Sequence, residues 1–291
     1  MSVINRTLSD TNIRRFLVDF KNLISIVNNS QGELDIAIRD EYLNVYYKGN
    51  SLAKISFKAD GRYQVEIHIK FFEGTDADDP VFYAEKTLGK DYAYLTLDSD
   101  KPPKRFLQKR HINQFCSRIK KVNYGEEIVF EQALITDNLG RDDIIIIDRQ
   151  IRDTVLTRRL DLLALKQVTS HSNQYCFQVL EVKLGNNREL EKDVAIQLDT
   201  YVKHIESHFD DYKVCYEKQF QQKRELGLLD TPDLSSIDIL KPVEGIVVVG
   251  GYSKLASRHI AILQSSFPEL LIKKFEPKLS DTLMLLSHEH A

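Results

Sequence analysis

The stretch YCFQVLEVKLGNN, residues 175 to 187, sets the expected fold of the second half of the chain, because it predicts a buried strand with two charges near its end. Successive side chains of a strand point to opposite faces, so Glu181 and Lys183 share one face. An unpaired buried charge is costly. The carboxylate and the ammonium therefore form a structural ion pair at the strand end, or they need a metal ion or water as a partner.

The preceding strand, TRRLDLLALKQ at residues 157 to 167, also carries a single acid, Asp161, among leucines. Two neighbouring strands that each present one carboxylate predict a divalent-metal site, since hard oxygen ligands suit Mg²⁺ or Mn²⁺. Lys183 beside such a site would orient or deprotonate a metal-activated water, or stabilise charge on a reacting phosphate. The pattern thus points to phosphate chemistry.

Further elements surround these two strands in a regular order. A helix is predicted at 125–138, a strand at 142–151, a long helix at 188–209 and a loop or lid at 220–242. A buried strand at 244–252, a helix at 254–267 and a last strand at 270–276 complete the chain. The expected order is helix, three strands, helix, strand.

Asp161 with Glu181-Val182-Lys183, set in this element order, resembles the PD-(D/E)XK nuclease superfamily over roughly residues 104 to 275. Gln197 and Tyr201 in AIQLDTY are similar to the Gln-x-x-x-Tyr pattern on the helix that follows the Glu-x-Lys strand in many members. Leu160 stands where the motif has proline. The resemblance implies an α/β fold with a restriction-endonuclease-like core, α-β-β-β-α-β, in which helices flank a mixed sheet.

The same resemblance implies a Mg²⁺- or Mn²⁺-dependent nuclease that hydrolyses DNA phosphodiester bonds, in restriction, phage defence or repair. It implies Asp161 and Glu181 as metal ligands, Lys183 beside the nucleophile and Gln197 orienting a neighbour. It also implies an acid on the helix before the first core strand, for which Glu131 is the choice. Two alternatives stay open: Glu127 in place of Glu131, and a catalytically inactive nuclease fold that binds nucleic acid or acts as a scaffold.

The first hundred residues have a different pattern. Apolar spacing predicts one helix over residues 11 to 28, followed by an antiparallel meander of strands at 33–39, 42–49, 51–57 and 63–72, with a hairpin turn at Gly49-Asn50. Pro102-Pro103 marks the expected boundary between an α+β module, residues 1–100, and the nuclease-like domain, residues 104–291. Several aromatic residues of the module are candidates for its core or for binding substrate, a partner or a second copy of the chain: Tyr42, Tyr46, Tyr47, Tyr63, Phe71 and Phe72.

The charge balance requires any nucleic-acid site to be local. Lys and Arg number 40 against 43 Asp and Glu, a net charge of −3, which excludes a uniformly basic nucleic-acid coat. The basic helix predicted at 104–122, with Lys109, Arg110 and Arg118, and the lysines of 213–224 are expected to contact DNA phosphates, unless they are only solvated surface.

Other patterns give mainly exclusions. Three cysteines without CxxC spacing argue against a disulfide framework or a thiolate zinc site and favour a reducing cytoplasm. The chain has no apolar run long enough to span a membrane. His204 and His208 lie four residues apart but lack a third zinc ligand, and VVVGGYSK lacks P-loop spacing.

Overall fold

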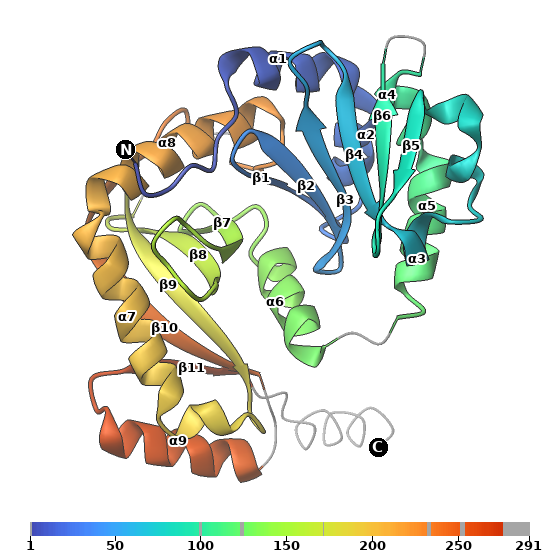
Figure 1. Cartoon of the computed structure of the whole chain (residues 1–291). Helices are drawn as coiled ribbons and strands as arrows, with labels where there is room; N and C mark the ends of the chain where they lie inside the picture. The colour runs from blue at the N-terminus through green and yellow to red at the C-terminus, as the bar shows by residue number, and fades with distance from the viewer. Residues whose placement is uncertain are drawn as a thin grey trace, which may run out of the picture.

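The computed structural model describes residues 2–98, 101–122, 125–170, 172–231, 234–250 and 254–275, and it contains two β-sheets with helices packed against them (Figure 1). The chain is therefore a mixed α/β protein. Among the described residues, no helix has both the length and the apolar character needed to cross a bilayer.

The first sheet has six antiparallel strands in the order β1-β2-β3-β4-β6-β5. Its strands are β1 (Leu34–Ile38), β2 (Tyr42–Tyr47), β3 (Asn50–Phe57), β4 (Tyr63–His68), β5 (Glu85–Leu88) and β6 (Tyr92–Leu97). The strands predicted at 33–39, 42–49 and 51–57 are confirmed, and burial alternates along β2 and β4. The strand predicted at 63–72 is partly wrong, because it ends at His68 and residues Ile69–Phe72 form a short helix. The last two strands were not predicted.

Helices cover one face of this sheet. They are α1 (Asp10–Asp19), α2 (Lys21–Asn28), α3 (Ile69–Phe72), α4 (Pro103–Phe106) and α5 (Lys109–Ile119), with 3-10 turns at Asp76–Asp78 and Pro80–Phe82. The single helix predicted over 11–28 is wrong, because the chain leaves helical geometry at Phe20, whose buried ring packs against Phe16 and Tyr63.

The basic helix predicted at 104–122 is also divided in two, and it packs with the first sheet. Phe106, Ile112, Phe115 and Ile119 are all buried in the core of that sheet. Residues up to Ile119 therefore pack mainly with the first sheet, although Ile4 lies in the core of the second sheet and Leu226 in that of the first. The boundary predicted at Pro102-Pro103 stays a prediction about folding units.

The second sheet has the order β11-β10-β9-β8-β7 and is mixed. Its strands are β7 (Ile144–Ile151), β8 (Leu160–Gln167), β9 (Gln174–Leu184), β10 (Asp238–Gly250) and β11 (Leu271–Phe275). The first three are antiparallel to one another, whereas β10 and β11 continue the sheet in parallel with β9. Helix α6 (Glu126–Asp137) precedes β7, which gives the predicted sequence of helix followed by three strands.

Helices lie on both faces of the second sheet. Phe130, Leu134 and Ile135 of α6 pack on one face. The other face holds α7 (Asp193–Ser207) and α8 (Phe209–Glu225), preceded by a 3-10 turn at Arg188–Glu191, and α9 (Lys254–Ser266) follows β10. Figure 1 shows α6 between the two sheets.

The predicted helix at 188–209 and loop at 220–242 are both partly wrong. The chain turns at His208 and continues as α8 to Glu225, and β10 already begins at Asp238. Side chains of α8 bind the N-terminal segment: Gln219 donates to the carbonyl of Arg6, and Gln222 bonds both the amide and the carbonyl of Leu8. These distant contacts stabilise a helix whose sequence reads as polar.

The tip of the β2–β3 hairpin of the first sheet contacts α6. Lys48 and Gly49 both have positive φ, 46° and 81°, as a two-residue type I′ turn requires, so the turn lies one residue before the predicted Gly49-Asn50. A Cβ atom on Gly49 would overlap Cγ2 of Ile128. Glycine therefore allows the tip to contact α6 directly.

Candidate active site

Strands β8 and β9 bring Asp161 and Glu181 opposite each other. The two strands are antiparallel and Leu162 pairs with Leu180, so the two acids occupy the next position of the ladder. The Asp161 carboxylate accepts a hydrogen bond from the Val182 amide at 2.9 Å. Both acids therefore lie on one face at the same end of the two strands.

The positive charge near Asp161 and Glu181 does not offset the burial and mutual repulsion of their two carboxylates. Glu181 is fully buried; its Oε1 accepts a hydrogen bond from Lys183 Nζ at 2.8 Å, and its Oε2 has no hydrogen-bond partner within the described part of the chain. Burial raises the pKa of Glu181, and the nearby charge of Asp161 raises it further. Burial also raises the pKa of Asp161. A bound cation would relieve this repulsion.

Lys183 stays protonated in this environment. Burial would lower its pKa, but Glu181 and Asp161 raise it above the ordinary value for lysine. Its Nζ also lies 3.3 Å from Oε2 of Glu189, an acid that the sequence did not single out. The ammonium form suits a role in stabilising negative charge better than a role as a base.

The two candidate acids of α6 differ in their contacts. Glu131 is buried; it accepts hydrogen bonds from Gln150 Nε2 at 3.0 and 3.1 Å, and Arg149 Nη2 lies 3.4 Å away. Burial and the charge of Asp161 raise the pKa of Glu131 to about 7. Gln150 and Arg149, which no sequence pattern marked for this role, thus hold the predicted acid in place.

Glu127 lies one helical turn before Glu131. Its Oε1 is buried and, among the described residues, has no hydrogen-bond partner. Burial raises its pKa, while the charge of Lys183 lowers it and that of Asp161 raises it. Both acids therefore interact electrostatically with Asp161, and the choice between them stays a prediction.

Gln197 reaches the site through Tyr201. Gln197 Nε2 donates to the Tyr201 hydroxyl at 3.0 Å, and that hydroxyl donates to the carbonyl of Arg159 at 2.8 Å. Arg159 lies two residues before Asp161. Helix α7 packs close to β10 at Gly245, where a Cβ atom would lie only 2.9 Å from Val202 Cγ2. Gln197 and Tyr201 thus fix the backbone that leads into the first acid.

The donor set fits a divalent cation. Asp161 and Glu181 supply hard oxygens, and one buried oxygen of Glu181 has a free accepting position in the described structure. No group of three or more His, Cys, Asp or Glu side chains that could hold a metal occurs among the described residues. Mg²⁺ commonly takes one or two carboxylates and completes its shell with water and substrate oxygens, so two acids are sufficient.

Other polar residues on or near the second sheet have structural contacts. Asp148 is buried between Arg39 and Arg6 of the N-terminal segment and accepts a hydrogen bond from the Tyr216 hydroxyl at 3.1 Å. His204 bonds to Asp153, with Nε2 2.5 Å from Oδ2. These acids hold elements together and lie outside the Asp161–Glu181 pair.

The lysines of 213–224 differ in exposure: Lys218 is exposed, and phosphate contact by it stays a prediction. Lys223 is buried and donates to the Ile147 carbonyl at 2.6 Å, so the prediction is wrong for this residue. Lys213 is paired with Asp238 at 2.5 Å. Burial of Lys223 follows from the extension of α8 across the region predicted to be a loop.

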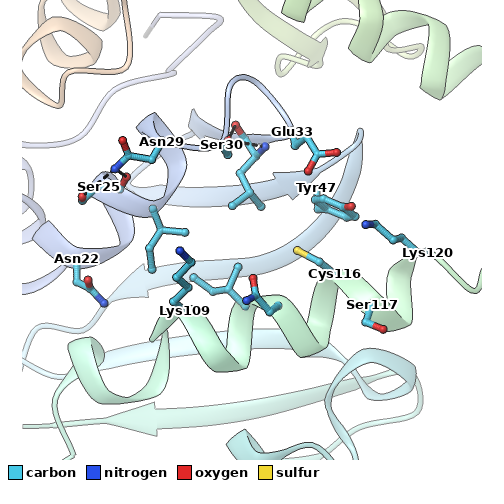
Figure 2. Close-up of a pocket in the computed structure, with 14 residues that line it drawn as sticks. Asn22, Ser25, Asn29, Ser30, Glu33, Tyr47, Lys109, Cys116, Ser117 and Lys120 are labelled. Carbon is cyan, nitrogen blue, oxygen red and sulfur yellow. Dashed lines mark hydrogen bonds between the residues drawn. The ribbon is translucent and has the colours of Figure 1, made fainter.

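The basic face of α5 borders a polar hollow of about 630 Å³ beside the first sheet (Figure 2). Lys109 and Lys120 line it with Cys116, whose pKa burial raises to about 12. Arg110 pairs with Asp76, and Arg118 donates to the Glu73 carbonyl. Phosphate binding by this helix stays a prediction, and both of its named arginines already have protein partners.

Comparison with known proteins returned no matching family model, no matching curated protein and no matching solved structure. Function is therefore inferred from the residues of the site.

Proposed function

We propose that the chain is a Mg²⁺- or Mn²⁺-dependent nuclease of the PD-(D/E)XK superfamily that hydrolyses DNA phosphodiester bonds. The observation that carries the proposal is the position of Asp161 and Glu181 opposite each other on adjacent strands, with Lys183 Nζ 2.8 Å from the second acid. The order α6, β7, β8, β9, α7, β10 and the mixed sheet support a restriction-endonuclease-like core.

Asp161 and Glu181 would hold the metal ion. The ion would supply a Lewis acid that activates a water and offsets charge on the phosphate. The Val182 amide fixes the Asp161 carboxylate in place before any ligand binds, because the hydrogen bond comes from rigid strand backbone. Such preorganisation lowers the cost of assembling the site.

Lys183 would stabilise negative charge that develops on the phosphate oxygens. Its ammonium is held by Glu181 at 2.8 Å and by Glu189 at 3.3 Å, so both its position and its charge are maintained by acids. Gln197 is a positioning residue that acts through Tyr201 on the backbone at Arg159. Glu131 or Glu127 would supply a further acid from α6.

A cytoplasmic location agrees with the three cysteines, all within the described residues and all free. The alternative function is a silent nuclease fold that binds nucleic acid or acts as a scaffold. The Glu181–Lys183 ion pair favours this alternative, because it gives one oxygen of Glu181 a charged partner without a metal.

Incubation with plasmid, linear, single-stranded and branched DNA, with Mg²⁺, Mn²⁺ or EDTA, tests the proposal. We expect metal-dependent cleavage that Asp161→Ala abolishes. Asp143→Ala is the matched control, since Asp143 is an exposed acid just before β7 that pairs only with Arg141 in the described structure. DNA binding without cleavage under every condition would support the silent alternative.

A further inference from the structure

A cleft of about 600 Å³ lies between the first sheet and the α6–β7 region. Six of its lining residues are Lys or Arg and three are Asp or Glu, whereas the whole chain has a net charge of −3. The cleft is thus a local basic site of the kind that the overall charge requires for a polyanion. Glu131, whose pKa responds to the charge of Asp161, lines the same cleft.

The outer face of the first sheet supplies aromatic rings to this cleft. Strand alternation buries Tyr47 and Tyr63 in the core but directs Tyr42 and Tyr46 of β2 to the opposite face, where they line the cleft with Tyr92 of β6. Two of these rings make cation–π contacts. Lys54 Nζ lies 4.8 Å from the centroid of the Tyr42 ring. Similarly, Arg149 Cζ lies 5.1 Å from the centroid of Tyr46.

Two arginines at the cleft are available for a ligand. Arg152 and Arg159 are exposed, and neither has a carboxylate partner among the described residues. The other lining cations are engaged; Lys54, for example, pairs with Glu66 at 2.9 Å. Arg159 also lies two residues before Asp161, so an anion bound there would be close to the candidate active site along the chain.

We propose that this cleft binds a single-stranded segment of nucleic acid, with bases stacked on Tyr42 and Tyr92 and phosphates on Arg152 and Arg159. Aromatic rings interleaved with cations are the combination that binds unpaired strands, because every base has a π-face and every nucleotide a phosphate. A volume of about 600 Å³ is in the range that encloses one drug-sized ligand, so the cleft accommodates one or two nucleotides of an unpaired strand and not a base-paired duplex.

This inference rests on the proposed nuclease function and specifies its substrate as a strand with unpaired nucleotides. Binding is measured by fluorescence anisotropy with oligo(dT), oligo(rU) and a DNA duplex, in EDTA, so that cleavage plays no part. Wild-type protein should bind the single strands more tightly than the duplex. The two single-stranded probes distinguish DNA from RNA as the source of the segment.

Two variants test the named contacts. Arg152→Gln with Arg159→Gln should reduce the salt slope of log K for single strands by about 1.4, since each phosphate contact contributes about 0.7. Tyr42→Ala should weaken binding about tenfold through loss of one stacked base. The matched control is Arg14→Gln with Arg258→Gln, two exposed arginines outside the cleft.

Thermal melts identify any variant that fails to fold, and Tyr42→Leu, which keeps an apolar side chain, then replaces Tyr42→Ala. An unchanged salt slope in the Arg152/Arg159 variant, or tighter binding of duplex than of single strands, would overturn the cleft proposal even if the protein cleaves DNA. Conversely, cleft-dependent binding without metal-dependent cleavage would overturn the nuclease function and leave the cleft as a binding site.

Discussion

The carboxylate of Asp161 on β8 is hydrogen-bonded to the backbone amide of Val182 on β9, at 2.9 Å. The first acid is therefore anchored to the strand that carries the second, between Glu181 and Lys183. Because a backbone amide of a sheet moves little, the relative position of the two acids is fixed by the strands and not by a bound ligand.

Replacing Asp161 by asparagine removes the negative charge of the side chain but keeps an oxygen that accepts the Val182 hydrogen bond. The side-chain amide oxygen of the variant would still accept the Val182 hydrogen bond, so Asp161→Asn should fold normally. Loss of the anionic ligand should weaken Mg²⁺ binding by about 100-fold or more, beyond the roughly 10- to 100-fold effect of outer-shell changes, as measured by titration calorimetry. Equal Mg²⁺ affinity in wild type and variant would remove Asp161 from the metal site.

Lys183→Ala should abolish most cleavage while leaving metal and DNA binding nearly intact. Loss of one such electrostatic contact costs about 10²- to 10³-fold in rate. Single-turnover cleavage assays measure this loss, and Lys192→Ala, an exposed lysine before α7, is the control. Wild-type turnover in the Lys183 variant, under conditions where wild type requires metal, would show that the ammonium takes no part in the reaction.

The metal-free protein should lose stability as the pH rises. Burial and the charge of Asp161 raise the pKa of Glu131 from 4.5 to about 7 in the folded state, so the folded protein binds more protons than the unfolded chain between these values. The free energy of unfolding should therefore fall between about pH 4.5 and pH 7, and Glu131→Gln should flatten this dependence. Urea unfolding in EDTA measures it, with Glu126→Gln, an exposed acid of the same helix, as the control.

Asp148→Asn should destabilise the protein by about 3–5 kcal/mol, because it leaves a buried Arg39 without its counter-charge. Burial would raise the pKa of Asp148, but Arg39 and Arg6 lower it below its ordinary value. The contribution is thus complete above that ordinary value and is lost as the pH falls through the lower, folded-state pKa. Urea denaturation should show a far smaller change for Asp143→Asn, whose ion pair is exposed.

Local patterns predicted the strands well where one face is buried. The alternation of β2 and β4 and the apolar run of β9 correspond directly to their burial. Strand β5 was missed because all four of its residues are exposed, which leaves no apolar alternation to detect. It is formed by pairing with β6, a contact between chain segments that no local pattern records.

Helix ends depended on tertiary contacts. The apolar spacing of residues 11–28 continues through Phe20, so the sequence contains no signal for the break between α1 and α2. Helix α8 was not predicted, because its buried polar residues, among them Gln222 and Lys223, bind distant backbone groups. In the candidate site, Asp161, Glu181 and Lys183 were predicted because each is a charged residue within an apolar strand. Glu189 and Gln150 lie in polar stretches of sequence, where nothing distinguishes them from their neighbours.

Gly49 at the tip of the β2–β3 hairpin lies in close contact with Ile128 of α6. A Cβ at position 49 would have to displace Ile128 Cγ2, and it would also meet Arg149 Nη2 at 3.0 Å. A single added methyl group would thus act as a wedge that pushes the hairpin away from the helix bearing Glu127 and Glu131. Glycine in the turn therefore permits the short distance between the hairpin and α6 at the point where both line the cleft.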